Sequence, residues 1–79
     1  MKPERVFRIG PVTASVFANE VEGGKRHVRN VSLQRRYRDD SDGEWKSSNS
    51  FGLGDLPQAI AVLDLAMKFV TEKEATISG

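Results

Sequence analysis

Apolar and polar residues alternate along the first two thirds of the chain, and the last third changes to helical spacing. Residues 6–19 are rich in β-branched and aromatic side chains but are interrupted at Gly10-Pro11, so they predict either two short strands or one kinked strand. The same alternation predicts further strands at 27–38 and 44–51. Turn signals separate these segments at 22–25 and at 39–43.

A helix is predicted from about Leu56 to about Lys73. Asp55 is expected to cap its first turn by accepting the backbone amide of Gln58, and residues 74–79 are expected to fray. Residues 1–79 are therefore expected to form one α+β domain. Its antiparallel sheet of three or four strands (β-β-β-α or β-β-β-β-α) spans about 6–51, and the helix packs on one face.

Strand alternation predicts one apolar and one polar face for this sheet. The apolar set is expected to pack under the helix, and it comprises Val12, Ala14, Val16, Ala18, Val31, Leu33, Tyr37, Trp45 and Phe51. The polar set carries hydroxyls, amides, cations and one aromatic ring; it includes Phe17, Asn30, Ser32, Gln34, Arg36, Arg38, Lys46 and Ser48.

The formal net charge of +1 conceals a strongly basic segment. Between Lys25 and Arg38 the chain places six cations and no acid, which favours a polyanionic partner. On the polar face, cations can bind phosphates, amides and hydroxyls can bind base edges, and Phe17 can stack on a base. The alternative is an ordinary solvated face of a two-layer domain. The candidate nucleic-acid-binding residues are Phe17, Arg26, Arg29, Asn30, Ser32, Gln34, Arg36, Arg38, Lys46 and Ser48.

The predicted helix is apolar over a wider sector than one sheet can cover. One stripe contains Ile60, Leu63, Met67 and Val70, and a neighbouring stripe contains Val62, Leu65 and Phe69. We therefore expect a homodimer whose interface includes Leu65, Phe69 and Val62. The alternative is a thicker monomeric core closed by the N-terminal residues.

Composition excludes several classes of site and protein. The chain has no cysteine, so disulfides, cysteine-based metal centres and thiol catalysis are excluded. No apolar run approaches the length of a membrane span, and a cytoplasmic protein is expected. The acidic turn at 39–44 lacks the calcium-loop pattern, and the single histidine, His27, lies among cations. We expect no enzymatic activity, metal, cofactor, small-molecule substrate or membrane partner.

The order of strands and helix, with a basic strand and a C-terminal apolar helix, resembles the single-strand-binding folds of the positive-cofactor-four, Whirly and PUR-repeat group. This resemblance covers nearly the whole chain at the level of architecture and length, and it rests on no diagnostic motif. It implies a curved sheet that binds single-stranded DNA or RNA, a helix that packs against a second copy, and a role such as transcription regulation. Phe7-Arg8-Ile9-Gly10 and Ser50-Phe51-Gly52 are also similar to segments of small bacterial proteins that carry no function to transfer.

Two alternatives to single-strand binding remain open. Residues 45–51 followed by Asp55-Leu56-Pro57 are similar to the last strand and helix start of the three-stranded domains of plant ethylene-response factors and integrase N-termini. Those domains lay their sheet in the major groove of duplex DNA. The other alternative is an adaptor that docks a protein partner through its helix or sheet edge.

Overall fold

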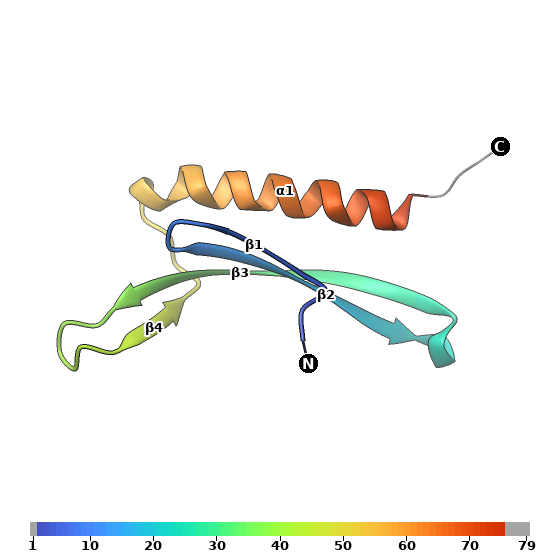
Figure 1. Cartoon of the computed structure of the whole chain (residues 1–79), viewed down its shortest axis with the longest axis horizontal. Coiled ribbons are helices and arrows are strands. Elements are labelled where there is room, and N and C mark those ends of the chain that lie inside the picture. The colour runs from blue at the N-terminus through green and yellow to red at the C-terminus, as the bar shows by residue number, and fades with distance from the viewer. Residues whose placement is uncertain (1, 76–79) are drawn as a thin grey trace.

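The computed structural model describes residues 2–75, which form a four-stranded antiparallel sheet covered on one face by a long helix (Figure 1). The predicted α+β class is confirmed, with four strands and one helix. Neighbouring strands in the sheet are also neighbours in the chain. The elements are β1 (Arg5–Ile9), β2 (Val12–Val21), the 3-10 turn η1 (Glu22–Gly24), β3 (Arg26–Arg38), β4 (Trp45–Ser48), the 3-10 turn η2 (Leu53–Asp55) and α1 (Leu56–Glu74).

The break at Gly10-Pro11 divides the first predicted strand into two. Ile9 pairs with Val12, so Gly10 and Pro11 form the two-residue turn of a hairpin. Gly10 has a φ of +58°, which glycine adopts without the steric cost that a Cβ brings. β3 also binds this turn, because the backbone N–H of Arg36 donates to the Pro11 carbonyl at 2.8 Å. The turn thus fixes the position of β1 and β2 relative to β3.

Helix α1 begins at Leu56 as expected and extends one residue past Lys73, to Glu74. The predicted cap at Asp55 is wrong. Asp55 is already in a helical conformation at the end of η2, and its carboxylate reaches back to accept the backbone N–H of Gly52 at 3.2 Å. Of the tail expected to fray, Ala75 has an extended backbone and residues 76–79 lie outside the described part of the chain. Between residues 2 and 75, no helix is long and apolar enough to cross a membrane.

The core lies between β2 and one side of α1. It consists of small side chains, which allow the helix to pack closely on the sheet. Val62 is completely buried in this core, so the prediction that it contacts a second copy is wrong. The buried residues are Val12, Ala14 and Val16 of β2 with Ala59, Val62 and Ala66 of α1. Around them pack Phe7, Ile9, Leu33, Phe51, Phe69 and Val70.

Removing part of the Val62 side chain should therefore destabilise the protein. Val62→Ala deletes two methyl groups from a fully packed site, and we expect the free energy of unfolding to fall by about 1.5–3 kcal/mol. Thr71→Ala, on the exposed side of the same helix, should change it by less than about 0.5 kcal/mol. Urea unfolding followed by circular dichroism measures both. Equal effects would contradict this assignment of the core.

Candidate functional site

The face of the sheet opposite α1, which we call the open face, is set by the strand register. Ala14 of the core pairs with Leu33 of β3, so the next pair, Thr13 with Gln34, points to the other side. This alternation gives the open face four arginines and no carboxylate on any strand. Its residues are Val6 and Arg8 (β1); Thr13, Ser15, Phe17, Asn19 and Val21 (β2); Arg26, Val28, Asn30, Ser32, Gln34, Arg36 and Arg38 (β3); Trp45 and Ser47 (β4).

The structure assigns most of the predicted site residues to this face, in an arrangement that leaves a polar track along β3. Phe17 lies directly across from Asn30, Ser15 from Ser32, and Thr13 from Gln34. Arg26 lies at one end of the track and Arg36 and Arg38 at the other. The predicted face is confirmed for Phe17, Asn30, Ser32, Gln34, Arg36 and Arg38. Arg26, a candidate binding residue to which the sequence assigned no face, lies on the same side. The binding role of all seven residues stays a prediction.

Arg29, also a candidate for nucleic-acid binding, lies on the helix side because it pairs with Ala18. Its guanidinium donates two hydrogen bonds to the Glu4 carboxylate, at 2.8 and 3.1 Å, and lies 3.8 Å from Glu74 of α1. Only 13% of its side chain is exposed. The hydrogen bond from Arg29 lowers the pKa of Glu4, which favours the charged form of this pair. Arg29 thus joins the start of β1, β3 and the end of α1, and its charge is neutralised.

The predicted placement of Lys46 and Ser48 on the polar face is wrong. Lys46 pairs with Tyr37 and Ser48 with Arg35, both on the helix side. Conversely Trp45, predicted to be in the core, is on the open face and 61% exposed. The strand ends at Ser48, so the alternation does not continue to Phe51, which packs on the core.

The cations on the helix side of the β3–β4 half are all paired with carboxylates. Lys46 Nζ lies 2.8 Å from Asp39 Oδ2 and 3.0 Å from Asp42 Oδ2. Arg35 Nε donates to the Ser50 carbonyl at 2.9 Å and lies 3.4 Å from Asp55 Oδ2. Two carboxylates of the acidic turn at 39–44 therefore bind Lys46.

The open-face arginines near this turn differ from those on the helix side. Within residues 2–75, Arg8, Arg36 and Arg38 have no carboxylate at ion-pair distance. Arg8 and Arg38 instead donate to backbone carbonyls of nearby turns, at Gly10 (3.4 Å) and Gly43 (3.2 Å). Each keeps its charge uncompensated and has further N–H groups for an anion. At the far end of the sheet, Arg26 has a long, exposed contact of 3.5 Å with Glu22.

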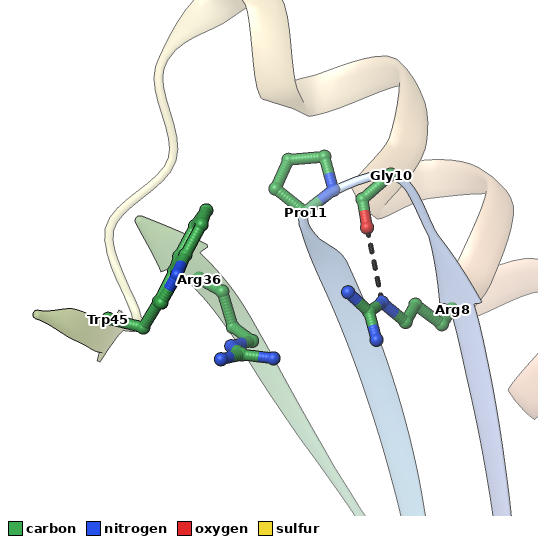
Figure 2. A pocket seen from close by; sticks show the side chains of 5 residues that line it. All are labelled: Arg8, Gly10, Pro11, Arg36 and Trp45. Atoms are coloured by element: carbon green, nitrogen blue, oxygen red, sulfur yellow. Dashed lines mark hydrogen bonds between the residues drawn. The ribbon is translucent and has the colours of Figure 1, made fainter. Parts of the chain in front are cut away.

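Arg8, Arg36 and Trp45 line a hollow beside the β1–β2 turn (Figure 2). Its volume is about 330 Å³, and Gly10 and Pro11 complete its wall. The guanidinium of Arg36 lies 5.4 Å from the centre of the Trp45 ring, a cation–π distance. Figure 2 shows both guanidinium groups on the same side of the turn, with Trp45 beyond Arg36. The hollow therefore combines two unpaired cations with an exposed aromatic ring.

Sequence reasoning missed Arg8 and Trp45, although the turns contain the signal that identifies them. Residues directly across an antiparallel hairpin share a face. With a turn at residues 39–44, Arg38 lies across from Trp45, and with a two-residue turn at Gly10-Pro11, Arg8 lies across from Thr13. Arg38 was predicted to be on the polar face, and so was Phe17, with which Thr13 shares the parity of the strand. The same face therefore follows for Trp45 and Arg8.

No family model, no curated protein and no solved structure matches this chain. The resemblance to the single-strand-binding families, and the one to the major-groove domains, therefore stay predictions. The site has to be interpreted from its own chemistry.

The turn at Asp39 generates a pH-dependent prediction. The pKa of Asp39 is lowered to about 2, first by the hydrogen bond from Lys46 and then by those from Ser41. Because this lies below the ordinary value of 3.8, the carboxylate stabilises the hairpin above about pH 4, and this contribution is lost as pH falls toward 2. Lys46→Met should raise the pKa of Asp39 toward its ordinary value. Titration of the carboxyl carbon by NMR measures it, and an unchanged midpoint in the variant would contradict the ion pair.

Proposed function

We propose that the protein binds single-stranded nucleic acid on the open face of its sheet. The observation that carries the proposal is the separation of charge between the two faces. On the helix side, Arg29, Arg35 and Lys46 are each matched by carboxylates. The strands of the open face carry four arginines and no acid. A merely soluble surface has no need for a face of one sign, because it usually mixes both charges.

The arginines can bind the phosphates. Arg36 and Arg38 are two residues apart on β3, so their side chains follow each other along the same face at a spacing of about 6.6 Å. Arg8 lies on the other side of the hollow. Three unpaired guanidinium groups in this region favour a partner with several successive anions over a single small anion.

The aromatic rings favour a single strand over a duplex. Trp45 is exposed at one end of the polar track, and Phe17 is half-buried across from Asn30 near its middle. Base stacking on such rings needs free base faces, which a duplex does not offer along its length. Asn30, Ser32 and Gln34 between them can bind the edges of unpaired bases. As part of this proposal we expect the protein to act in the cytoplasm without catalysing a reaction.

Loss of a phosphate contact should change the salt dependence of binding. Arg36→Ala and Arg38→Ala should each weaken binding of a single-stranded oligonucleotide and reduce the slope of log K against log salt by about 0.7. Lys68→Ala, on the exposed surface of α1, is a matched control that should leave the slope unchanged. Fluorescence anisotropy at several salt concentrations measures this. Equal slopes in all three variants would contradict binding on the open face.

Loss of a stacking platform should weaken binding without changing the salt slope. Trp45→Ala and Phe17→Ala should each cost about 1–3 kcal/mol of binding free energy. Since Trp45 is the only tryptophan, its fluorescence should be quenched directly when a single strand binds to the unmodified protein. Trp45→Phe, which retains a ring, should bind more tightly than Trp45→Ala.

A competition experiment separates the alternatives. Single strands should displace the labelled oligonucleotide better than duplex DNA of equal length. If duplex DNA competes better and Trp45 and Phe17 have no effect, the major-groove interpretation replaces ours. If neither polymer binds the folded protein at low salt, the protein-adaptor interpretation is favoured.

A further inference from the structure

Helix α1 has a second apolar surface that its own chain does not cover. Its side chains are exposed, with Ile60 at 68%, although the opposite side of the helix is part of the core. They recur at alternating intervals of three and four residues from η2 into α1, the spacing of the contact positions of a coiled coil. This surface, which we call the outer seam, consists of Leu53, Leu56, Ile60, Leu63 and Met67.

The outer seam lies on the side of α1 that faces β3. Continuing its spacing by seven residues from Met67 gives Glu74, which contacts Arg29 of β3 at 3.8 Å. The other flank of the helix carries Leu65 and Phe69, which lie beside Arg5 and Phe7 of β1. The seam thus belongs to the edge of the helix above the middle of the sheet.

The sheet next to the seam is also incompletely covered. Val31 of β3 pairs with the buried Val16 and points to the helix side, yet it is 40% exposed. The apolar helix edge and the apolar sheet position that stay uncovered are therefore both on the β3 side of α1 and on the helix side of the sheet. Together they form a surface that a second helix, lying next to α1, would bury.

We propose that this second helix is α1 of another copy of the chain, packed antiparallel to the first. Knobs-into-holes packing requires a partner with the same three–four spacing, and the described residues contain no other α-helix. A two-fold axis between residues 61 and 62 brings Ile60 opposite Leu63 of the other copy, and Leu56 opposite Met67. Each subunit then contributes the same residues to the interface.

Charge and core size support this occupant. The seam itself carries no charge. Asp64 and Lys68, which follow Leu63 and Met67 in the chain, bind each other at 2.9 Å, and Glu74, on the continuation of the seam, lies 3.8 Å from Arg29. No unpaired charge is therefore buried on association. Within residues 2–75 the buried core contains only three valines and three alanines, which is small for a domain of this length. The radius of gyration, 15.4 Å, also exceeds the roughly 12 Å of a compact domain of this length.

This interface differs from the one predicted from the sequence. Phe69 is packed against Phe7 in an edge-to-face arrangement at 6.1 Å, and Arg5 and Lys73 lie over its ring. Leu65 lies next to it, on the flank away from the seam. A dimer through the outer seam leaves the open face of each sheet accessible, so it does not depend on the proposed nucleic-acid binding.

Solution mass with two matched variants tests the proposal. The unmodified protein at micromolar concentration should have twice the 8.8 kDa mass of one chain, measured by light scattering. Ile60→Glu, in the seam, should give a folded monomer of 8.8 kDa. Leu65 is also apolar and exposed, but it lies on the other flank of the helix, so Leu65→Glu should remain dimeric. A monomeric unmodified protein would overturn the proposal, as would a dimer that Leu65→Glu dissociates and Ile60→Glu does not.

Cysteine cross-linking keeps the test decisive if Ile60→Glu fails to fold. The chain has no cysteine, so a variant with Ile60→Cys and Leu63→Cys can form only the disulfides that its own packing allows. An antiparallel seam should give a covalent dimer under mild oxidation. Leu65→Cys should stay monomeric on a denaturing gel. Efficient cross-linking of Leu65→Cys with none through the seam would refute the antiparallel arrangement.

Discussion

One helix has to cover one face of a four-stranded sheet, and this shortage of apolar cover determines how the rest of the molecule is arranged. α1 packs on β1 and β2, where valine and alanine side chains allow a close approach. The helix-side positions of β3 and β4 that it cannot cover are held by Arg29, Arg35 and Lys46. Each is bound by carboxylates from the edges of the fold: the start of β1, the end of α1, η2 and the β3–β4 turn. Ion pairs thus lie beside the core, where the single helix supplies no apolar cover.

This arrangement has an electrostatic consequence for the other face. Glu4, Glu74, Asp55, Asp39 and Asp42 are directed to the helix side by the cations that they bind. The arginines of the open face have correspondingly few acids near them, and their field points to one side of the molecule. A chain of net charge +1 can therefore present a strongly basic surface, because strand alternation separates charges that are neighbours in the sequence.

Sequence alone could predict the order of the elements, the bounds of α1 to within one residue, and the faces of β2 and β3, because long regular segments have a clear period. It failed at β4, where only four residues pair and Phe51, beyond the strand, suggested the wrong parity. It also failed to identify which apolar stripe of α1 is buried. Hydrophobicity does not distinguish Val62 from Leu65, whereas the small Ala59 and Ala66 mark the side that approaches the sheet most closely.

Lys46, which the sequence wrongly predicted to be on the open face, supports the site from the helix side of the sheet. β4 carries Trp45 on the open face and, one residue later, Lys46 on the helix side. The bonds from Lys46 to Asp39 and Asp42 close the β3–β4 turn and so restrict the strand on which Trp45 is mounted. At the same end of the sheet, the hydrogen bond from the Arg36 backbone N–H to the Pro11 carbonyl connects β3 to the β1–β2 turn. Arg8 lies in β1, two residues before this turn. The walls of the hollow are therefore linked by a backbone hydrogen bond between β3 and the β1–β2 turn, and by ion pairs on the helix side of the sheet. A flat ligand that enters between Trp45 and the arginines would meet groups already in position, and less of the binding free energy would be spent on ordering them.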